Sequence, residues 1–113
     1  MVYDFSVFGG TGQQGRMCSR DLLEQGYRVL IIGRDASKIQ LLLKKHKNAG
    51  FRTVDLKNER DIERAIRESG ALLVVNCAEL MYNVVIMKAC LKTRRSCTDL
   101  GGLQYVTQEQ FKL

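Results

Sequence analysis

Four glycines fall within seven residues, in the stretch GGTGQQG from Gly9 to Gly15, between an apolar segment and a helical one. Such a segment is costly to order, because glycine gives up more backbone freedom on folding than any other residue. The spacing satisfies both G-x-G-x-x-G and G-x-x-G-x-x-G. In this pattern a strand turns tightly into a helix and the pyrophosphate of a dinucleotide touches bare backbone. The alternative, a glycine turn without a ligand, is disfavoured by the strand before the loop and the helix after it.

The glycines of this loop have separable tasks. An early glycine makes the tight turn, Gly12 removes the side chain where the pyrophosphate would approach, and Gly15 lets the helix lie close to the strands. The N–H groups at the start of the helix then point at the phosphates, with the helix dipole behind them. The loop residues predicted to bind the dinucleotide are Gly9, Gly10, Thr11, Gly12, Gln13, Gln14 and Gly15.

The end of the second apolar run reads LIIGRDASK, with Gly33 followed by Arg34. A small residue followed by arginine makes room for the 2′-phosphate of NADP and supplies a planar cation to hold it. Ser37 and Lys38 lie close behind and add further donors. Asp35 keeps NAD open as the alternative, because a shift of one residue would place an acid at the ribose. Without a ligand, Arg34 and Asp35 would simply form a solvated loop.

Three further residues are expected at the same cavity. Asp55 ends the third predicted strand, where an acid can meet the adenine amino group, although capping of its own loop explains it nearly as well. Cys77 and Ala78 end the fourth predicted strand at the carboxyl edge, where open α/β sheets bind ligands. Cys77 is interpreted as a small buried thiol, because it has no histidine partner in view. Asp99 shares this edge and is the most suggestive of the remaining acids.

Short apolar runs alternate with helical periods along the whole chain. Strands are predicted over 3–8, 27–32, 51–56, 71–78 and 95–100, with helices over 13–25, 37–47, 59–69 and 81–92 and another beginning near Leu103. Alternating strands and helices with short connections form a parallel sheet with right-handed crossovers. The sequence therefore predicts a doubly wound α/β fold of strand order 3-2-1-4-5, which lacks the sixth strand of a complete dinucleotide-binding fold.

Composition narrows the class of protein. The 113 residues are 45% hydrophobic and 27% charged, which is typical of one soluble globular domain spanning 1–113. The longest apolar run is ALLVV, too short for a membrane span, and MVYDF does not resemble a signal peptide. The four cysteines are therefore expected to be reduced thiols in the cytoplasm. With one histidine and no C-x-x-C pair, no metal site is expected.

Taken in order, GGTGQQG, IIGRD, VVNCA and CLKTRRSCTDLGG resemble the N-terminal NAD(P)-binding Rossmann domain of the saccharopine dehydrogenase-like oxidoreductases. The resemblance covers nearly the whole chain, although the TRRS interval is more basic than the family pattern. It implies an NAD(P)-dependent oxidoreductase as the full-length protein, with a substrate-binding domain after residue 113. This N-terminal piece would then bind the cofactor without turnover, and its catalytic residues are unknown because they would lie beyond Leu113.

Other functions share parts of this pattern. The glycine loop is also similar to that of atypical short-chain reductases and of NmrA-like regulators, in which the dinucleotide is a signal. Nucleic-acid binding through Arg94, Arg95 and Lys44–Lys47 is suggested by the net charge of +6. It is disfavoured, because lysines that close a helix are explained by the helix dipole. An uncovered fifth strand would invite a second copy to pair with it, which predicts a homodimer.

Overall fold

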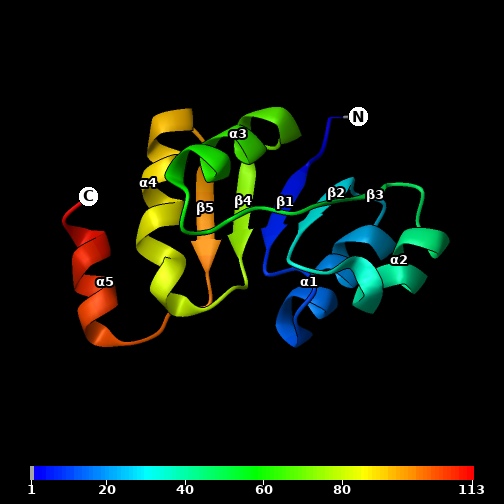
Figure 1. Ribbon diagram of the computed structural model, residues 1–113, viewed down its shortest axis with the longest axis horizontal. Helices are drawn as coiled ribbons and strands as arrows, with labels where there is room; N and C mark the ends of the chain where they lie inside the picture. Colours follow the sequence, from blue (N-terminus) through cyan, green and yellow to red (C-terminus); the bar gives the residue numbers. More distant parts are fainter. Residues whose placement is uncertain (1) are drawn as a thin grey trace.

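The computed structural model describes residues 2–113. Its centre is a five-stranded parallel sheet of order β3-β2-β1-β4-β5, as predicted (Figure 1). The strands are β1 (Phe5–Phe8), β2 (Val29–Ile32), β3 (Ala49–Arg52), β4 (Leu73–Asn76) and β5 (Ser96–Asp99). The ends of β1 and β4 are in register, with Phe8 opposite Asn76. The carboxyl ends of the central strands therefore meet at one edge of the sheet.

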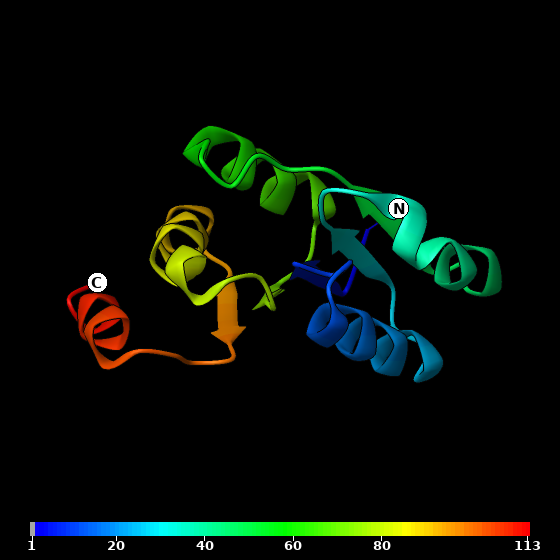
Figure 2. The ribbon, with the colours of Figure 1, turned by 60° about the horizontal axis from the view of Figure 1, so that its bottom comes forward.

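Five α-helices and two short 3₁₀ helices connect and follow the strands. They are α1 (Gln13–Glu24), η1 (Ala36–Ile39), α2 (Gln40–Lys45), α3 (Glu59–Ser69), η2 (Leu80–Tyr82), α4 (Asn83–Thr93) and α5 (Gln104–Phe111). Figure 2 shows α3 and α4 on one side of the strands and α1 on the other. No helix of residues 2–113 is both long and apolar enough to cross a membrane.

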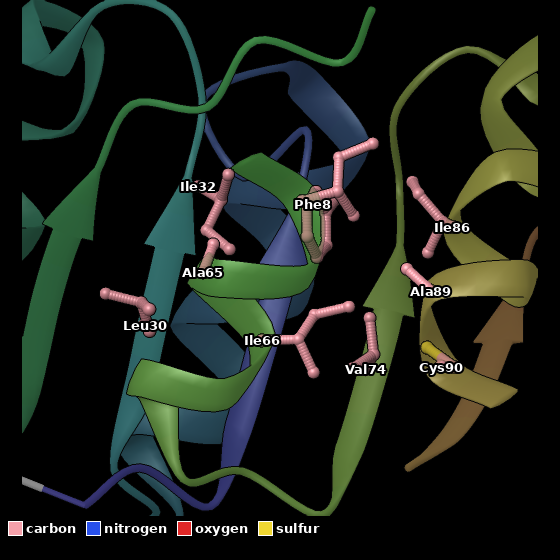
Figure 3. Close-up of a cluster of buried hydrophobic side chains, with 10 residues drawn as sticks. Phe8, Leu30, Ile32, Ala65, Ile66, Val74, Ile86, Ala89 and Cys90 are labelled. Atoms are coloured by element: carbon pink, nitrogen blue, oxygen red, sulfur yellow. The ribbon is translucent and has the colours of Figure 1, made fainter. Parts of the chain in front are cut away.

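The sheet is buried on both faces by two separate hydrophobic clusters. On one face, Phe8, Ile32 and Val74 pack against α3 and α4, through Ile62, Ala65, Ile66, Ile86, Ala89 and Cys90 (Figure 3). On the other face, Val7, Val29 and Ile31 pack against Leu23 of α1 and Ile39 of η1. All four residues of β2 are buried. This burial on both faces explains why its sequence is continuously apolar instead of alternating.

Local signals fix the ends of the helices. The side chain of Asn58 accepts a hydrogen bond from the N–H of Asp61, so Asn58 is the N-cap of α3, as predicted. Glu59 and Asp61 lie in the first turn, where negative charge favours the helix dipole. Gly26 follows the end of α1, and its N–H donates to Leu23 (3.0 Å). The predicted cap at this position is therefore confirmed.

The first, second, fourth and fifth strands are one or two residues shorter at their ends than predicted, and the third strand and two helices differ in other ways. The third strand is Ala49–Arg52 and not 51–56, because Thr53–Leu56 leaves the sheet and turns toward α3. A side chain at Gly50 would overlap the Tyr3 ring, so this strand needs a small residue there. The predicted helices 37–47 and 81–92 each begin with a 3₁₀ turn, η1 and η2, before the α-helix. At η1 the tight first turn is fixed by Asp35, which accepts the N–H of Ser37 (2.9 Å).

The predicted C-terminal helix is present and is attached to the last strand by Asp99. This carboxylate accepts hydrogen bonds from the N–H of Gly101 (2.7 Å) and from Nε2 of Gln110 (2.9 Å). Tyr105 of α5 also reaches back, with its hydroxyl on the sulfur of Met81 (3.4 Å). Asp99 therefore positions α5 beside α4 (Figure 1).

Among residues 2–113, Arg94 is the only non-glycine residue with a positive φ. It ends α4 in the left-handed conformation (φ 57°), the same role that Gly70 has at the end of α3 (φ 70°). The following N–H, of Arg95, donates to Cys90 (2.8 Å). This helix ending favours glycine, because a side chain in the left-handed region is strained by roughly 1–2 kcal/mol.

We therefore expect Arg94→Gly to stabilise the protein by about 1 kcal/mol, which would raise the melting temperature by about 4 °C. The matched control is Lys88→Gly, at an exposed position inside the same helix. It should lower stability by about 1 kcal/mol, because glycine is a poor helix former. Thermal unfolding followed by circular dichroism measures both, and equal losses in the two variants would contradict the prediction.

Candidate functional site

A cavity of about 960 Å³ lies at the carboxyl edge of the sheet. The loops that follow β1, β2, β3 and β4 surround it. Its lining is Phe8, Gly9, Thr11, Gly12, Ile32, Gly33, Arg34, Asp35, Lys38, Val54, Asp55, Leu56, Lys57, Cys77, Ala78, Glu79 and Tyr82. The size is that of a cofactor site, and the position is where open α/β sheets bind ligands.

Three glycines of the loop are required by the packing of the protein itself. Gly9 has a positive φ (71°), and a Cβ there would lie 2.5 Å from the backbone nitrogen of Ala78. A Cβ at Gly10 would overlap the side chain of Ile31. A Cβ at Gly15 would overlap the carbonyl of Gly9, because α1 crosses directly over the turn. The loop is therefore locked against β2 and β4 by contacts that only glycine permits.

Gly12 differs from these three glycines. Its φ of −77° is open to any residue, and a Cβ built there would meet only the Gly9 carbonyl oxygen, at an ordinary 3.4 Å. Gly12 is exposed and lines the cavity. Beside it begins α1, whose first N–H groups have no intrahelical acceptor. The backbone N–H groups of Gln13 and Gln14 donate to no other backbone carbonyl within residues 2–113. The bare backbone and these donors fit a pyrophosphate.

The space above Gly33 is filled by a side chain that the sequence position of Gly33 did not indicate. A Cβ at Gly33 would lie 2.5 Å from the hydroxyl oxygen of Thr11 and 2.6 Å from its methyl carbon. The space above Gly33 is therefore filled by the threonine of the glycine loop. Gly33 thus lets the end of β2 approach the glycine loop, and this contact alone accounts for a small residue there.

The charged groups of the cavity are not equivalent. Arg34, Lys38 and Lys57 supply cations, and none of them forms an ion pair with any residue of 2–113. Asp35, in contrast, accepts the N–H of Ser37 with one oxygen (2.9 Å) and its hydroxyl with the other (2.7 Å). These hydrogen bonds lower the pKa of Asp35. Both oxygens of Asp35 are therefore engaged, whereas the cations are available to an anion.

Two other polar side chains hold the loops around the cavity. Asp55 accepts the N–H of Lys57 (3.0 Å), so it caps its own loop while lining the cavity. Asn76, buried at the end of β4, donates from Nδ2 to the Oδ1 of Asn83 (2.6 Å) and accepts the N–H of Ala78 (2.9 Å). This buried amide pair joins the end of β4 to the start of α4. It fixes the backbone on which Gly9 packs.

Cys77 lies on the cavity wall and faces Cys18 of α1. Both thiols are half-buried and pack against the same hydrophobic cluster. Burial, with Cys18 nearby, raises the pKa of Cys77 to about 11. Burial also raises the pKa of Cys18. Protonated thiols are poor nucleophiles, which matches the interpretation of Cys77 as a packing residue.

The structure brings most of the predicted binding residues to one cavity. Gly9, Thr11, Gly12, Arg34, Asp35, Lys38, Asp55, Cys77 and Ala78 line it, whereas Gly10, Gln13, Gln14, Gly15 and Ser37 do not. Sequence reasoning missed Lys57 and Tyr82, which also line the cavity. The signal for Lys57 was available, because it lies two residues after Asp55. Among residues 2–113, no group of three or more His, Cys, Asp or Glu could hold a metal ion.

Fold and cavity together define a Rossmann-like domain built around a glycine-loop cavity. The family model described as the saccharopine dehydrogenase NADP binding domain matches residues 5–113. The chain therefore belongs to this family, and it is an NADP-binding domain of the saccharopine dehydrogenase type. No curated protein sequence matches it.

Solved structures share the fold. A short-chain dehydrogenase/reductase from Veillonella parvula in complex with NADP is 18% identical, with a TM-score of 0.72 over 88% of this chain and 47% of its own. AtPrR2, solved with NADP⁺ and (+)pinoresinol, is 16% identical, with a TM-score of 0.70 over 99% of this chain and 45% of its own. UDP-glucose 4-epimerase from Thermus thermophilus with NAD is 24% identical, with a TM-score of 0.66 over 80% of this chain and 34% of its own. The chain thus spans less than half of each.

The two kinds of glycine predict opposite behaviour on substitution. Gly15→Ala should destabilise the protein by about 2 kcal/mol, because its Cβ meets backbone that cannot move aside. Gly12→Ala should change stability by less than about 1 kcal/mol, because the site is open on the protein side. Urea unfolding of the ligand-free protein measures both. Similar losses in both variants would refute the distinction.

The raised pKa of Cys77 predicts the pH dependence of its alkylation. Its reaction with iodoacetamide should keep accelerating up to about pH 11, instead of levelling off near the ordinary thiol value of 9.0. The folded state holds a proton that the unfolded chain loses first, so the free energy of unfolding should fall between these two pH values. Mass spectrometry of the Cys77 peptide follows the rate, with urea-unfolded protein as the control. A plateau near pH 9 in the folded protein contradicts this.

Proposed function

We propose that this NADP-binding domain holds its cofactor at the carboxyl-edge cavity. Gly12 and the N–H groups of Gln13 and Gln14 would receive the pyrophosphate. Arg34 and Lys38 would hold the 2′-phosphate, and the wall from Val54 to Lys57 would take the adenine. The other predicted residues would shape the cavity or support these groups. They are Gly9, Gly10, Thr11, Gly15, Asp35, Ser37, Cys77 and Ala78. The bound cofactor supplies hydride transfer.

The observation that carries this proposal is the asymmetry among the four glycines. Gly9, Gly10 and Gly15 are accounted for by the fold, but no protein contact accounts for Gly12. A ligand that touches the backbone at Gly12 accounts for it. The preference for NADP is supported by the charges. Within residues 2–113, Arg34 and Lys38 form no ion pair, while both oxygens of Asp35 already accept a hydrogen bond from Ser37.

We further propose that the whole protein is an NADP-dependent oxidoreductase in which this domain serves a separate substrate-binding domain. Residues 1–113 form one domain in this reading, and the catalytic groups belong to the other. A cytoplasmic location is supported by four free cysteines, which persist in a reducing compartment. A homodimer through β5 is supported by the position of that strand at the sheet edge, with Ser96 and Thr98 exposed.

The test of cofactor binding compares NADPH with NADH by thermal stabilisation of the purified protein. A ligand at a hundred times its dissociation constant adds roughly 2.7 kcal/mol to stability. We expect NADPH to raise the melting temperature at concentrations where NADH does not. Arg34→Gln should weaken the binding of NADPH by about tenfold, because it removes a charge-assisted contact to the 2′-phosphate. The difference between NADPH and NADH should then become smaller.

Gly12→Val serves as the variant that fills the ligand side of the loop. It should abolish stabilisation by both dinucleotides while the ligand-free protein remains folded. Lys44→Gln, an exposed cation of α2 that does not line the cavity, is the matched control for Arg34→Gln. Equal stabilisation by NADPH and NADH would indicate that Asp35, and not Arg34, contacts the ribose. Unchanged NADPH affinity in Gly12→Val would refute the proposed site.

A further inference from the structure

A second hollow, which we call the α1/α2 groove, lies between helix α1 and the segment formed by η1 and α2. It has a volume of about 480 Å³. Its lining is Gln13, Arg16, Met17, Arg20, Lys38, Leu41 and Leu42. The α1 residues recur at helical spacing and form one stripe along the outer side of this helix. Figure 1 shows α1 and α2 as neighbours at one end of the molecule, opposite α5.

The groove carries three cations and no free acid. Arg16, Arg20 and Lys38 form no ion pair with any residue of 2–113. Arg16 uses only its Nε, on the carbonyl of Gly12 (3.3 Å). None of the described residues that line the groove is an acid. The carboxylate nearest in sequence to Lys38, that of Asp35, is bound to Ser37 through both oxygens. The groove therefore presents three cations that form no ion pair within residues 2–113.

Apolar side chains accompany these charges. Leu41 is 82% exposed and Met17 is 51% exposed, although both lie in structured helices. Leu42, in contrast, turns inward against the core cluster beneath α1 and α2. A lysine or glutamate at position 41 would favour the helix about as well as leucine does. The exposed leucine and methionine beside three free cations therefore give the groove both an apolar and a positive character.

We propose that the α1/α2 groove binds an acidic amphipathic helix of a partner protein. Its carboxylates would pair with Arg16 and Arg20, and its apolar side chains would cover Met17 and Leu41. A helix laid between two helices is a common mode of peptide recognition. A nucleic acid would use the cations but leave Leu41 in water. A bilayer is a flat surface, whereas this site is concave.

This inference goes beyond cofactor binding and is tested without any dinucleotide. Of the groove residues, Lys38 also lines the cofactor cavity, whereas Arg20 and Leu41 line the groove alone. Variants at Arg20 and Leu41 therefore probe the groove without disturbing the proposed cofactor site. Both side chains are exposed, so neither substitution removes a core contact.

The probe is a fluorescent synthetic helix of glutamate and leucine, with leucines at i, i+4 and i+7, titrated at low salt and followed by anisotropy. The unmodified protein should bind it, and binding should weaken as salt rises. Arg20→Gln and Leu41→Ser should each weaken binding by about tenfold. Lys44→Gln, which removes an exposed cation of α2 outside the groove, should leave binding unchanged.

Three results would overturn the proposal. The first is no binding of the helix at low salt. The second is equal weakening by Lys44→Gln, or equal binding of a peptide of the same composition with its leucines spread around the helix, because either shows unspecific charge attraction. The third is that a single-stranded oligonucleotide or an anionic phospholipid vesicle binds through Arg20 while the peptide does not.

Discussion

The architecture of the cavity at the carboxyl edge of the sheet depends on one contact between backbones. The turn at Gly9 lies against the peptide that joins Cys77 to Ala78, closer than any side chain would allow. Beneath it, the N–H of Cys77 donates to the carbonyl of Phe8 (2.8 Å), which continues the pairing of β1 with β4 past the strand ends. Because α1 crosses the same turn at Gly15, this contact decides where the helix begins. It therefore decides where the free N–H groups of α1 point.

The general fold was predictable from the sequence because its signals are local. Apolar runs, helical periods and the N-cap at Asn58 each act within a few residues, and the crossover rule converts their order into a topology. The third strand was misplaced because its partner is not local. Ala49 and Gly50 have little tendency to form a strand, but they pair with β2 and fit under Tyr3. The run from Phe51 to Leu56 looked more like a strand, but only Phe51 and Arg52 belong to β3, and Val54, Asp55 and Leu56 line the cavity.

The candidate site was predicted in outline, since the glycine loop and Arg34 are read from a motif. The motif does not specify the contacts between one loop and another. Thr11 fills the space above Gly33, and Asn83 reaches Asn76 across a helix junction. The state of Asp35 was also undetermined, because an acid at this position binds either a ribose or its own backbone. In the structure its two oxygens accept hydrogen bonds from the N–H and the hydroxyl of Ser37.

The hydrogen bond from Gln110 to Asp99 affects the order in which parts of the domain unfold. β5 is the outermost strand and pairs only with β4, so it has the fewest neighbours on that side of the sheet. Because one carboxylate holds both the turn at Gly101 and the helix α5, neither can detach alone without breaking its hydrogen bonds. The last strand, turn and helix are thus linked through one carboxylate. Sub-global opening at this end would expose β4, and with it the loop against which Gly9 is packed.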